Sequence, residues 1–314
     1  MRNVWKRLTA TLLALAVVVA MVPGQRARAA SDVTQKGCKP TSITIQWNVP
    51  STSGGTVDNY KVYAGKDYSS RKLVATLPPD QTTYTLKKLK PGAVRYLEVG
   101  YDYTYDSGYQ GTDRYLGAIS SAKTTPCAVT GVKEKNWYHA LDEVNIAWKA
   151  IPSATGYQYR FFKNNGKTKA KGTTNYGSSV TASCPKVTET EVYTAKVRAF
   201  TEVNGKKYYG DWSGAAYLIP QPQVSKISIG KNKLGVKWGR VSGVTSYEIY
   251  MSTNKDKYKK VKTVKATKKD KKAITATVKK KLSKGKTYYV YVQAVKKVKK
   301  KTYKSVIYNY WYPL

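Results

Sequence analysis

An alternating apolar segment that ends in tryptophan occurs three times in this chain, and this repeat constrains the fold more than any other feature. In each copy apolar and polar residues alternate, a period of two that places one set of side chains in a core and the other in water. A tyrosine-rich segment with the same period follows each time. The tryptophan segments are residues 43–47, 144–148 and 234–238, and the tyrosine segments begin at Tyr60, Tyr157 and Tyr247. The copies recur about every 90–100 residues, which indicates tandem β-sheet domains rather than a solenoid of short units.

The composition favours folded sheets over a disordered polycation. The chain carries a formal charge of +38, yet 41% of its residues are hydrophobic, which is enough to bury real cores. Its aromatic residues are 28 Tyr and 7 Trp but only 3 Phe, a bias that suits strands. The one histidine, His139, rules out multi-histidine metal sites. We therefore expect no cofactor and no metal.

The first 30 residues have the three parts of a secretory signal peptide. A basic start precedes the apolar run 8–22, and a small-x-small sequence around Ala27 and Ala29 follows. The alternative is an uncleaved membrane anchor, but the run is shorter than the roughly 20 residues that a membrane-spanning helix needs. The C-terminal residues show neither a second apolar span nor a sorting signal. We expect a secreted protein that keeps no transmembrane anchor after cleavage.

The tryptophan and tyrosine segments, with the motif Leu-x-x-Gly-x-x-Tyr that follows them, resemble fibronectin type III domains. Residues 282–288 match this motif, and residues 187–193 keep its spacing but lose the glycine. In the first copy Arg95 occupies the tyrosine position, so the hydrogen-bonded tyrosine corner of the family is predicted to be missing there. The resemblance implies an all-β fold of three tandem seven-stranded fibronectin type III-like (immunoglobulin-like) β-sandwiches. The predicted boundaries are 1–30 for the signal peptide and 31–126, 127–220 and 221–314 for the three domains.

Lysine- and tyrosine-rich tandem copies behind a signal peptide resemble exported proteins of Gram-positive bacteria. In such proteins these domains are spacers, adhesive modules or accessories to glycan-degrading enzymes. The resemblance implies a non-enzymatic role but identifies no site, because a fold hosts many functions.

Three cysteines in an exported chain leave at least one thiol unpaired. In the seven-stranded topology that the resemblance implies, Cys38 and Cys127 lie at the same pole of the first domain. They are therefore candidates for a disulfide bridge. Cys184 aligns with Leu86 and is predicted to be a buried small hydrophobe.

No motif for nucleophilic, metal or phosphate chemistry is present in the sequence. Glu98, Asp102 and Asp106 share one face of a predicted strand, but steps of four residues separate them by about 13 Å each. Glycoside hydrolysis needs two carboxyl groups within about 5–10 Å. We interpret the three acids as a solvated strand face and expect no enzyme activity.

Aromatic side chains are better candidates for binding. Tyr101, Tyr103, Tyr105 and Tyr109 crowd one predicted hairpin, where Tyr105 and Tyr109 are candidates for glycan or protein contact. The alternative is that these rings only fill the core and cover the hairpin. Trp212 is predicted to stack with Arg198 in a structural cation–π contact.

The charge is concentrated in the third predicted domain. Residues 31–126 carry net +4 and residues 127–220 carry +6, whereas residues 221–314 carry +23. Two lysine runs interrupt the alternation and are candidate polyanion-binding residues: Lys268, Lys269, Lys271, Lys272, Lys299, Lys300 and Lys301. In the assumed topology both runs lie in loops at the junction with the second domain, where they would form one patch. The second domain presents Asp142, Glu143, Glu189 and Glu191 at that junction.

These features favour an exported, monomeric, non-enzymatic binding, adhesion or spacer protein. The leading hypothesis is electrostatic retention of the third domain on anionic wall or extracellular polymers, such as teichoic acid or acidic polysaccharide. Lysine suits such contacts better than base reading, so no sequence-specific nucleic acid partner is expected. The alternatives are a charge that serves solubility alone, and a carbohydrate-binding or accessory protein of a glycan-degrading system that uses exposed tyrosines.

Overall fold

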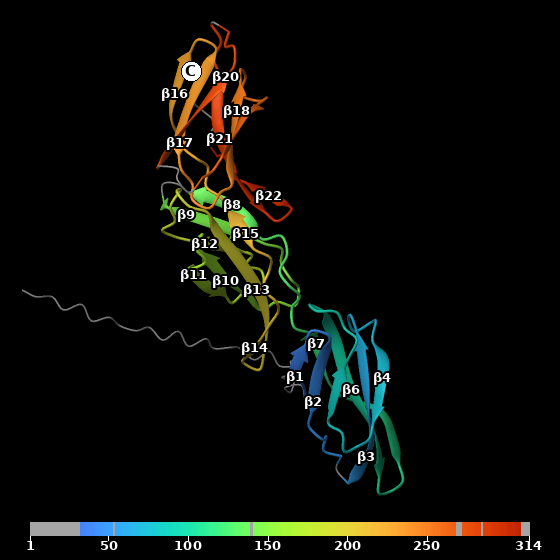
Figure 1. Ribbon diagram of the computed structural model, residues 1–314. Helices are drawn as coiled ribbons and strands as arrows, with labels where there is room; N and C mark the ends of the chain where they lie inside the picture. Colours follow the sequence, from blue (N-terminus) through green and yellow to red (C-terminus); the bar gives the residue numbers. More distant parts are fainter. Residues whose placement is uncertain (1–31, 53, 139–140, 268–271, 284, 309–314) are drawn as a thin grey trace, which may run out of the picture.

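The computed structural model describes residues 32–308 except 53, 139–140, 268–271 and 284, and these residues form strands and loops (Figure 1). The all-β prediction is confirmed. The described strands make six antiparallel sheets, which pair into three sandwiches that follow one another along the chain. The predicted signal peptide lies outside the described residues. Within the described part, no helix combines the length and apolarity of a membrane span.

The first sandwich packs the sheet β1-β2-β5 against the sheet β4-β3-β6-β7. Val62 pairs with Val99 across β3 and β6, and Ile43 pairs with Leu86 across β2 and β5. Its strands are β1 (Val33–Lys39), β2 (Ser42–Trp47), β3 (Gly55–Gly65), β4 (Lys72–Leu77), β5 (Thr83–Leu86), β6 (Val94–Tyr105) and β7 (Gln110–Lys123).

The second sandwich differs from the predicted seven strands, because its last strand is interrupted. β14 and β15 both pair with β13, and Gly210 and Ser213 between them bond to the main chain of β13. The sheets are β12-β9-β8 and β11-β10-β13-β14, with β15 beside β13. Its strands are β8 (Lys133–Tyr138), β9 (Glu143–Ala147), β10 (Gly156–Phe162), β11 (Thr168–Thr174), β12 (Thr181–Cys184), β13 (Tyr193–Val203), β14 (Lys206–Tyr209) and β15 (Ala216–Leu218).

The third sandwich repeats the arrangement of the first, with the sheets β16-β17-β20 and β19-β18-β21-β22. The predicted domain boundaries fall between β7 and β8 and between β15 and β16. Its strands are β16 (Val224–Gly230), β17 (Lys233–Gly239), β18 (Ser246–Ser252), β19 (Lys259–Lys265), β20 (Ala273–Lys279), β21 (Tyr289–Val298) and β22 (Lys301–Lys304).

Each core is built on the tryptophan and tyrosine that the repeat predicts. The ring centroids lie 5.3 Å apart for Trp47 and Tyr60, 5.3 Å for Trp148 and Tyr157, and 5.5 Å for Trp238 and Tyr247. All six side chains are buried. Since the tryptophan comes from one sheet and the tyrosine from the other, each pair joins the two layers of its sandwich.

The tyrosine corners also follow the sequence. The Tyr193 hydroxyl accepts a hydrogen bond from the Thr188 N–H at 3.0 Å, and the Tyr288 hydroxyl accepts one from the Ser283 N–H at 2.8 Å. In the first sandwich Arg95 holds this position and its side chain bonds the Val94 carbonyl instead. The glycine of the motif is therefore dispensable, because the second sandwich forms its corner without it.

Replacing Tyr193 by phenylalanine is expected to destabilise the second sandwich by about 1 kcal/mol, because the Thr188 N–H loses its acceptor. Urea denaturation followed by hydrogen exchange in β8–β15 measures this change. Tyr176→Phe is the matched control, since Tyr176 is 73% exposed in the same sandwich. Equal effects of the two substitutions would contradict a role for the corner.

The predicted bridge between Cys38 and Cys127 is wrong, since both are free thiols in the structure. Cys38 lies on β1 with its side chain buried, and this burial raises the pKa of the thiol to about 11. Cys127 is exposed beyond the end of β7, where its sulfur lies beside Gly92. Cys184 is fully buried opposite Val144, as predicted.

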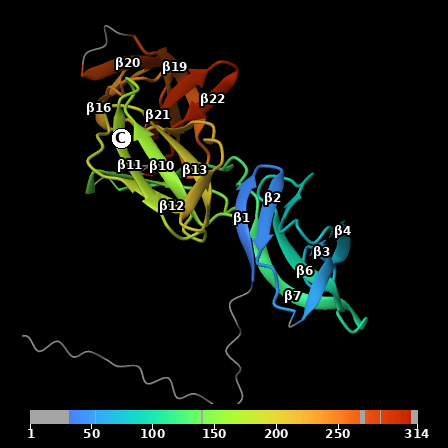
Figure 2. The same cartoon turned by 90° about the horizontal axis from the view of Figure 1, so that it is seen from below.

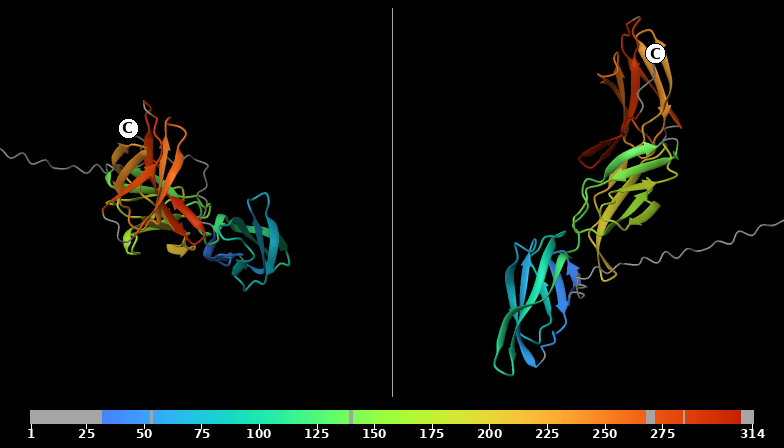
Figure 3. Two further views of the ribbon diagram at one scale, coloured as in Figure 1. Left: turned by 45° about the horizontal axis from the view of Figure 1, so that its top comes forward. Right: turned by 180° about the vertical axis from the view of Figure 1, so that it is seen from behind.

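Contacts also join consecutive sandwiches. The β13–β14 hairpin reaches the first sandwich, where the Asn204 side chain donates to the Gln35 carbonyl at 3.0 Å (Figure 1). At the second junction, Ser242 forms main-chain hydrogen bonds with Thr190 and Val192. The Tyr217 and Tyr303 rings pack there with centroids 4.5 Å apart. Figures 2 and 3 show the resulting order, with the first and third sandwiches at opposite ends.

Candidate binding surfaces

Lysines face one another across the strands of the β16-β17-β20 sheet. Lys226 pairs with Lys237 across β16 and β17, and Lys233 pairs with Lys279 across β17 and β20. All four side chains are exposed, because the alternate residues of β17 and β20 fill the core. Like charges that lie directly opposite each other destabilise a sheet. The arrangement thus concentrates positive charge at a cost to the fold.

The candidate polyanion-binding lysines that the structure describes lie at both sheets of the third sandwich. Lys272 lies just before β20, where its carbonyl accepts from the Arg240 N–H at 2.8 Å. Lys299, Lys300 and Lys301 are exposed at the turn between β21 and β22, in the other sheet. Lys268, Lys269 and Lys271 lie outside the described residues, so the single patch remains a prediction. The sequence did not indicate the cross-strand lysine pairs, because the register between two strands cannot be read from one sequence.

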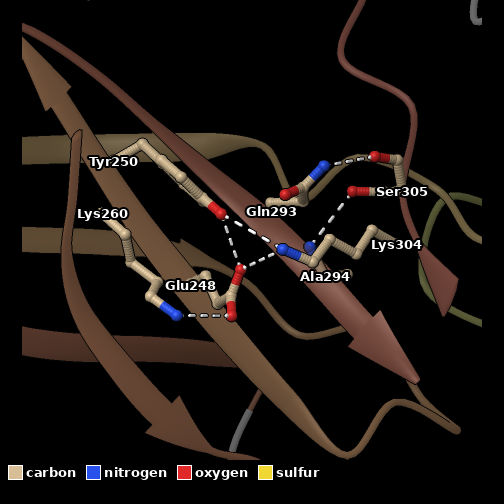
Figure 4. Close-up of polar contacts among 7 residues, drawn as sticks. All are labelled: Glu248, Tyr250, Lys260, Gln293, Ala294, Lys304 and Ser305. Carbon is tan, nitrogen blue, oxygen red and sulfur yellow. Dashed lines mark hydrogen bonds and ion pairs between the residues drawn. The ribbon is translucent and has the colours of Figure 1, made fainter. Parts of the chain in front are cut away.

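One carboxylate in this sandwich is paired internally (Figure 4). Glu248 on β18 is 8% exposed and accepts from Lys304 at 2.8 Å, Lys260 at 3.1 Å and the Tyr250 hydroxyl at 2.7 Å. Burial alone would raise the pKa of Glu248, but these hydrogen bonds outweigh it and hold the pKa at about 2. Glu248 therefore stays charged and offsets two lysines of the β19-β18-β21-β22 sheet.

The tyrosine hairpin of the first sandwich forms a row of rings along β6 and the turn after it. Tyr103 is buried and packs edge-on against Tyr105 at 4.9 Å, and the Tyr105 ring lies 6.1 Å from that of Tyr109. Tyr109 is 64% exposed. Gly111 lies under Tyr103, where any side chain would collide with the ring. Contact of Tyr105 and Tyr109 with a partner remains a prediction.

The predicted stack on Trp212 is present and larger than expected. The Arg198 guanidinium lies 4.7 Å from the Trp212 ring centroid and 4.0 Å from that of Tyr209. Arg160 approaches Trp212 from β10 at 5.1 Å. This set of contacts ties the interrupted last strand to β10 and β13, which is a structural role.

A groove that the sequence did not indicate lies on the outer face of the β4-β3-β6-β7 sheet. Its volume is about 930 Å³ and tyrosines from four parts of the first sandwich line it. Tyr63 comes from β3, Tyr96 from β6, Tyr115 from β7 and Tyr68 from the turn before β4. Period two placed Tyr96 on the same outer face as Glu98, but the sequence could not show that the Tyr68 turn closes over it.

Two ion pairs organise the groove. Glu98 is 9% exposed and bonds Arg71 at 3.1 Å and the Tyr96 hydroxyl at 2.7 Å, so its interpretation as a solvated residue is wrong. Asp102 bonds Lys61 at 3.0 Å beside the groove. Burial would raise the pKa of Asp102, but hydrogen bonds from Asp113 N–H, Lys61 and Asn59 hold it below its usual range.

Tyrosine hydroxyls in the groove are bound to carboxylates. Burial and the hydrogen bond to Asp113 raise the pKa of Tyr63 to about 12, and burial and Glu98 raise the pKa of Tyr96. Both hydroxyls are therefore protonated donors with oxygen lone pairs free to accept. Among the described residues, no cluster of three or more His, Cys, Asp or Glu side chains could hold a metal ion.

Comparison with known proteins relates the chain to fibronectin type III domains. A family model described as "Fibronectin type III domain" matches residues 28–96. Neogenin of Rattus norvegicus is 24% identical over 196 residues, which cover 59% of this chain and 13% of neogenin. The chain thus matches only a small part of that relative's length.

Two solved tandem fibronectin segments align with parts of this chain. The chicken CNTN1 FN1-FN3 domains align with a TM-score of 0.33 and 16% identity, covering 83% of this chain and 91% of that one. A two-domain fibronectin type III segment of chicken tenascin aligns with a TM-score of 0.32 and 14% identity, covering 60% and 98%. The family match, over residues 28–96, is what relates this chain to fibronectin type III domains.

Proposed function

We propose that this protein is an exported, non-enzymatic binding module that its third sandwich holds on anionic polymers of a bacterial cell surface. Fibronectin type III repeats commonly serve as binding or spacer modules, and the first two sandwiches fit that role. Teichoic acid and acidic polysaccharide are the polymer classes that match an exposed lysine surface outside a Gram-positive cell.

The cross-strand lysine pairs on β16, β17 and β20 carry this proposal. Solubility alone does not require like charges to lie directly opposite each other at a cost to the sheet, yet Lys226 lies opposite Lys237 and Lys233 lies opposite Lys279. A phosphate or carboxylate between two such ammonium groups relieves the repulsion, so anion binding recovers what the sheet loses.

The charge of this surface is not cancelled from within. The third predicted domain holds three acids, Glu248, Asp256 and Asp270, against 26 lysines and arginines, which gives its net charge of +23. Glu248 is committed to Lys260 and Lys304 on the other sheet. Lysine, a flexible point charge, binds repeating phosphates without requiring a fixed geometry.

The test is a variant in which Lys226, Lys233, Lys237 and Lys279 are all replaced by glutamine. Binding of the full exported chain to immobilised, purified wall teichoic acid is expected to weaken by about tenfold to a hundredfold near physiological salt. The slope of log affinity against log salt should also become shallower, since fewer counterions are released.

The matched control replaces four exposed lysines of the second sandwich: Lys133, Lys135, Lys149 and Lys167. It removes the same charge and should retain most of the binding. Equal losses in the two variants would show that net charge acts without a site. Binding that does not respond to salt, or no binding to the polymer, would refute the proposal.

A further inference from the structure

We propose that the groove on the β4-β3-β6-β7 sheet of the first sandwich binds a neutral oligosaccharide. The site is separate from the lysine surface, which lies on the third sandwich at the other end of the chain (Figure 1). It also differs from the Tyr105 and Tyr109 hairpin, since neither residue lines it.

The groove has the size and ring content that a sugar chain requires. A volume of about 930 Å³ accommodates several sugar rings. Tyr68 is 59% exposed and Tyr115 is 66% exposed, so both offer ring surface to a ligand. Sugar rings carry apolar C–H faces, which pack against aromatic faces and remove both from water. Leu73, which is 51% exposed, extends this apolar surface along β4.

The charges that line the groove balance, with Arg71 and Lys72 against Glu98 and Asp113. Glu98 is neutralised by Arg71 and Asp102 by Lys61. A phosphate or carboxylate ligand would have to face Glu98 and Asp113, and a cationic ligand would compete with guanidinium and ammonium groups already in place. Tyrosine hydroxyls and carboxylate oxygens instead offer hydrogen bonds to the hydroxyls of an uncharged ligand.

The walls are held in place before any ligand arrives. Arg71 stacks on Tyr68 with its guanidinium carbon 3.7 Å from the ring centroid, and Tyr68 meets Tyr96 edge-on at 5.7 Å. The turn that carries Tyr68 is tied by Asp67, which accepts from the Ser70 N–H at 2.8 Å. Gly65 allows the turn to close, since a side chain there would collide with the main chain of Arg71. A site that is ordered in advance loses little entropy on binding.

The floor of the groove also depends on a glycine. Gly100 lies on the outer face of β6 between Glu98 and Asp102, and it pairs with Tyr115 on β7. A side chain at this position would crowd the Arg114 carbonyl, 3.1 Å from an added Cβ, and the Asp113 carboxylate at 3.6 Å. A sugar ring in the groove would lie among Tyr115, Glu98 and Asp113, which all line it.

The experiment measures binding of the full exported chain to an array of short neutral oligosaccharides of glucose, mannose, xylose and N-acetylglucosamine. We expect saturable binding to at least one of these classes, unchanged in about 1 M NaCl because no net charge is involved. Tyr115→Ala should weaken it about tenfold or more, and Tyr115→Phe, which keeps the ring, should restore most of it.

Tyr176→Ala is the matched control, since Tyr176 is 73% exposed on the second sandwich. It should bind like the unaltered protein, and far-UV circular dichroism should show that every variant is folded. No saturable binding to any of the sugars, or binding that Tyr115→Ala leaves intact, would overturn the proposal. Binding that salt abolishes, or that the fourfold lysine variant removes, would also overturn it by assigning the sugar to the lysine surface.

Discussion

Replacing Trp238 by alanine is expected to lower the free energy of unfolding of the third sandwich by about 4 kcal/mol. Trp238 is fully buried, and its ring joins β17 of one sheet to Tyr247 of the other. Alanine leaves a cavity that the rigid strands cannot close, and it removes the aromatic contact as well. Hydrogen exchange resolved along the chain in increasing urea measures the loss separately for β16–β22.

Trp212→Ala is the comparison for this substitution. Trp212 is half-buried on the surface of the second sandwich, where it stacks on Arg198 and Arg160. Its loss should cost the second sandwich about 1 kcal/mol and leave the third unchanged. If Trp238→Ala lowered the free energy of unfolding of the third sandwich by no more than Trp212→Ala lowers that of the second, Trp238 would not organise the core.

Replacing Glu248 by glutamine is expected to destabilise the third sandwich by about 2 kcal/mol at neutral pH. The value is discounted from the full pKa shift, because Lys260 and Lys304 are 49% and 41% exposed and regain water when the carboxylate is lost. The folded pKa of about 2 lies below the ordinary value of 4.5, so the stabilisation is complete above pH 4.5. It is lost as the pH falls from 4.5 towards about 2.

Urea denaturation of both proteins across this pH range gives the test. The difference between Glu248→Gln and the unaltered chain should shrink steadily below pH 4.5 and be nearly gone near pH 2. Asp256→Asn removes an exposed acid from the same sandwich and should change little at any pH. A difference that stays constant with pH would assign the effect of Glu248→Gln to packing rather than to charge.

The core could be predicted from the sequence because it depends on local periodicity. The alternation of apolar and polar residues predicted that the side chains of Trp47 and Val62 point into the core. The Leu-x-x-Gly-x-x-Tyr motif before β21 predicted the tyrosine corner at Tyr288. The stack of Arg198 on Trp212 was also predictable, since both residues lie on neighbouring strands of one predicted sheet.

The features that could not be predicted from the sequence depend on strand register and on the paths of loops. The groove joins Tyr63, Tyr96 and Tyr115, which only the pairing of β3, β6 and β7 brings together. The path of the turn before β4 adds Tyr68. The cross-strand lysine pairs need the register of β16, β17 and β20 to the residue. The bridge at Cys38 was expected because two cysteines share a pole, but sharing a pole does not fix the direction of a side chain.

The main-chain bonds of Ser242 have a mechanical consequence for a protein pulled between two surfaces. These hydrogen bonds join the third sandwich at Ser242 to the second sandwich at Thr190 and Val192. The chain segment between β15 and β16 joins the same two sandwiches, so a pulling force is shared between the hydrogen bonds and that segment. The described hydrogen bonds across the first junction come from the Thr201 and Asn204 side chains, with no main-chain pairing among them. Under load the chain should therefore bend first between the first and second sandwiches, while the second and third move as one lever.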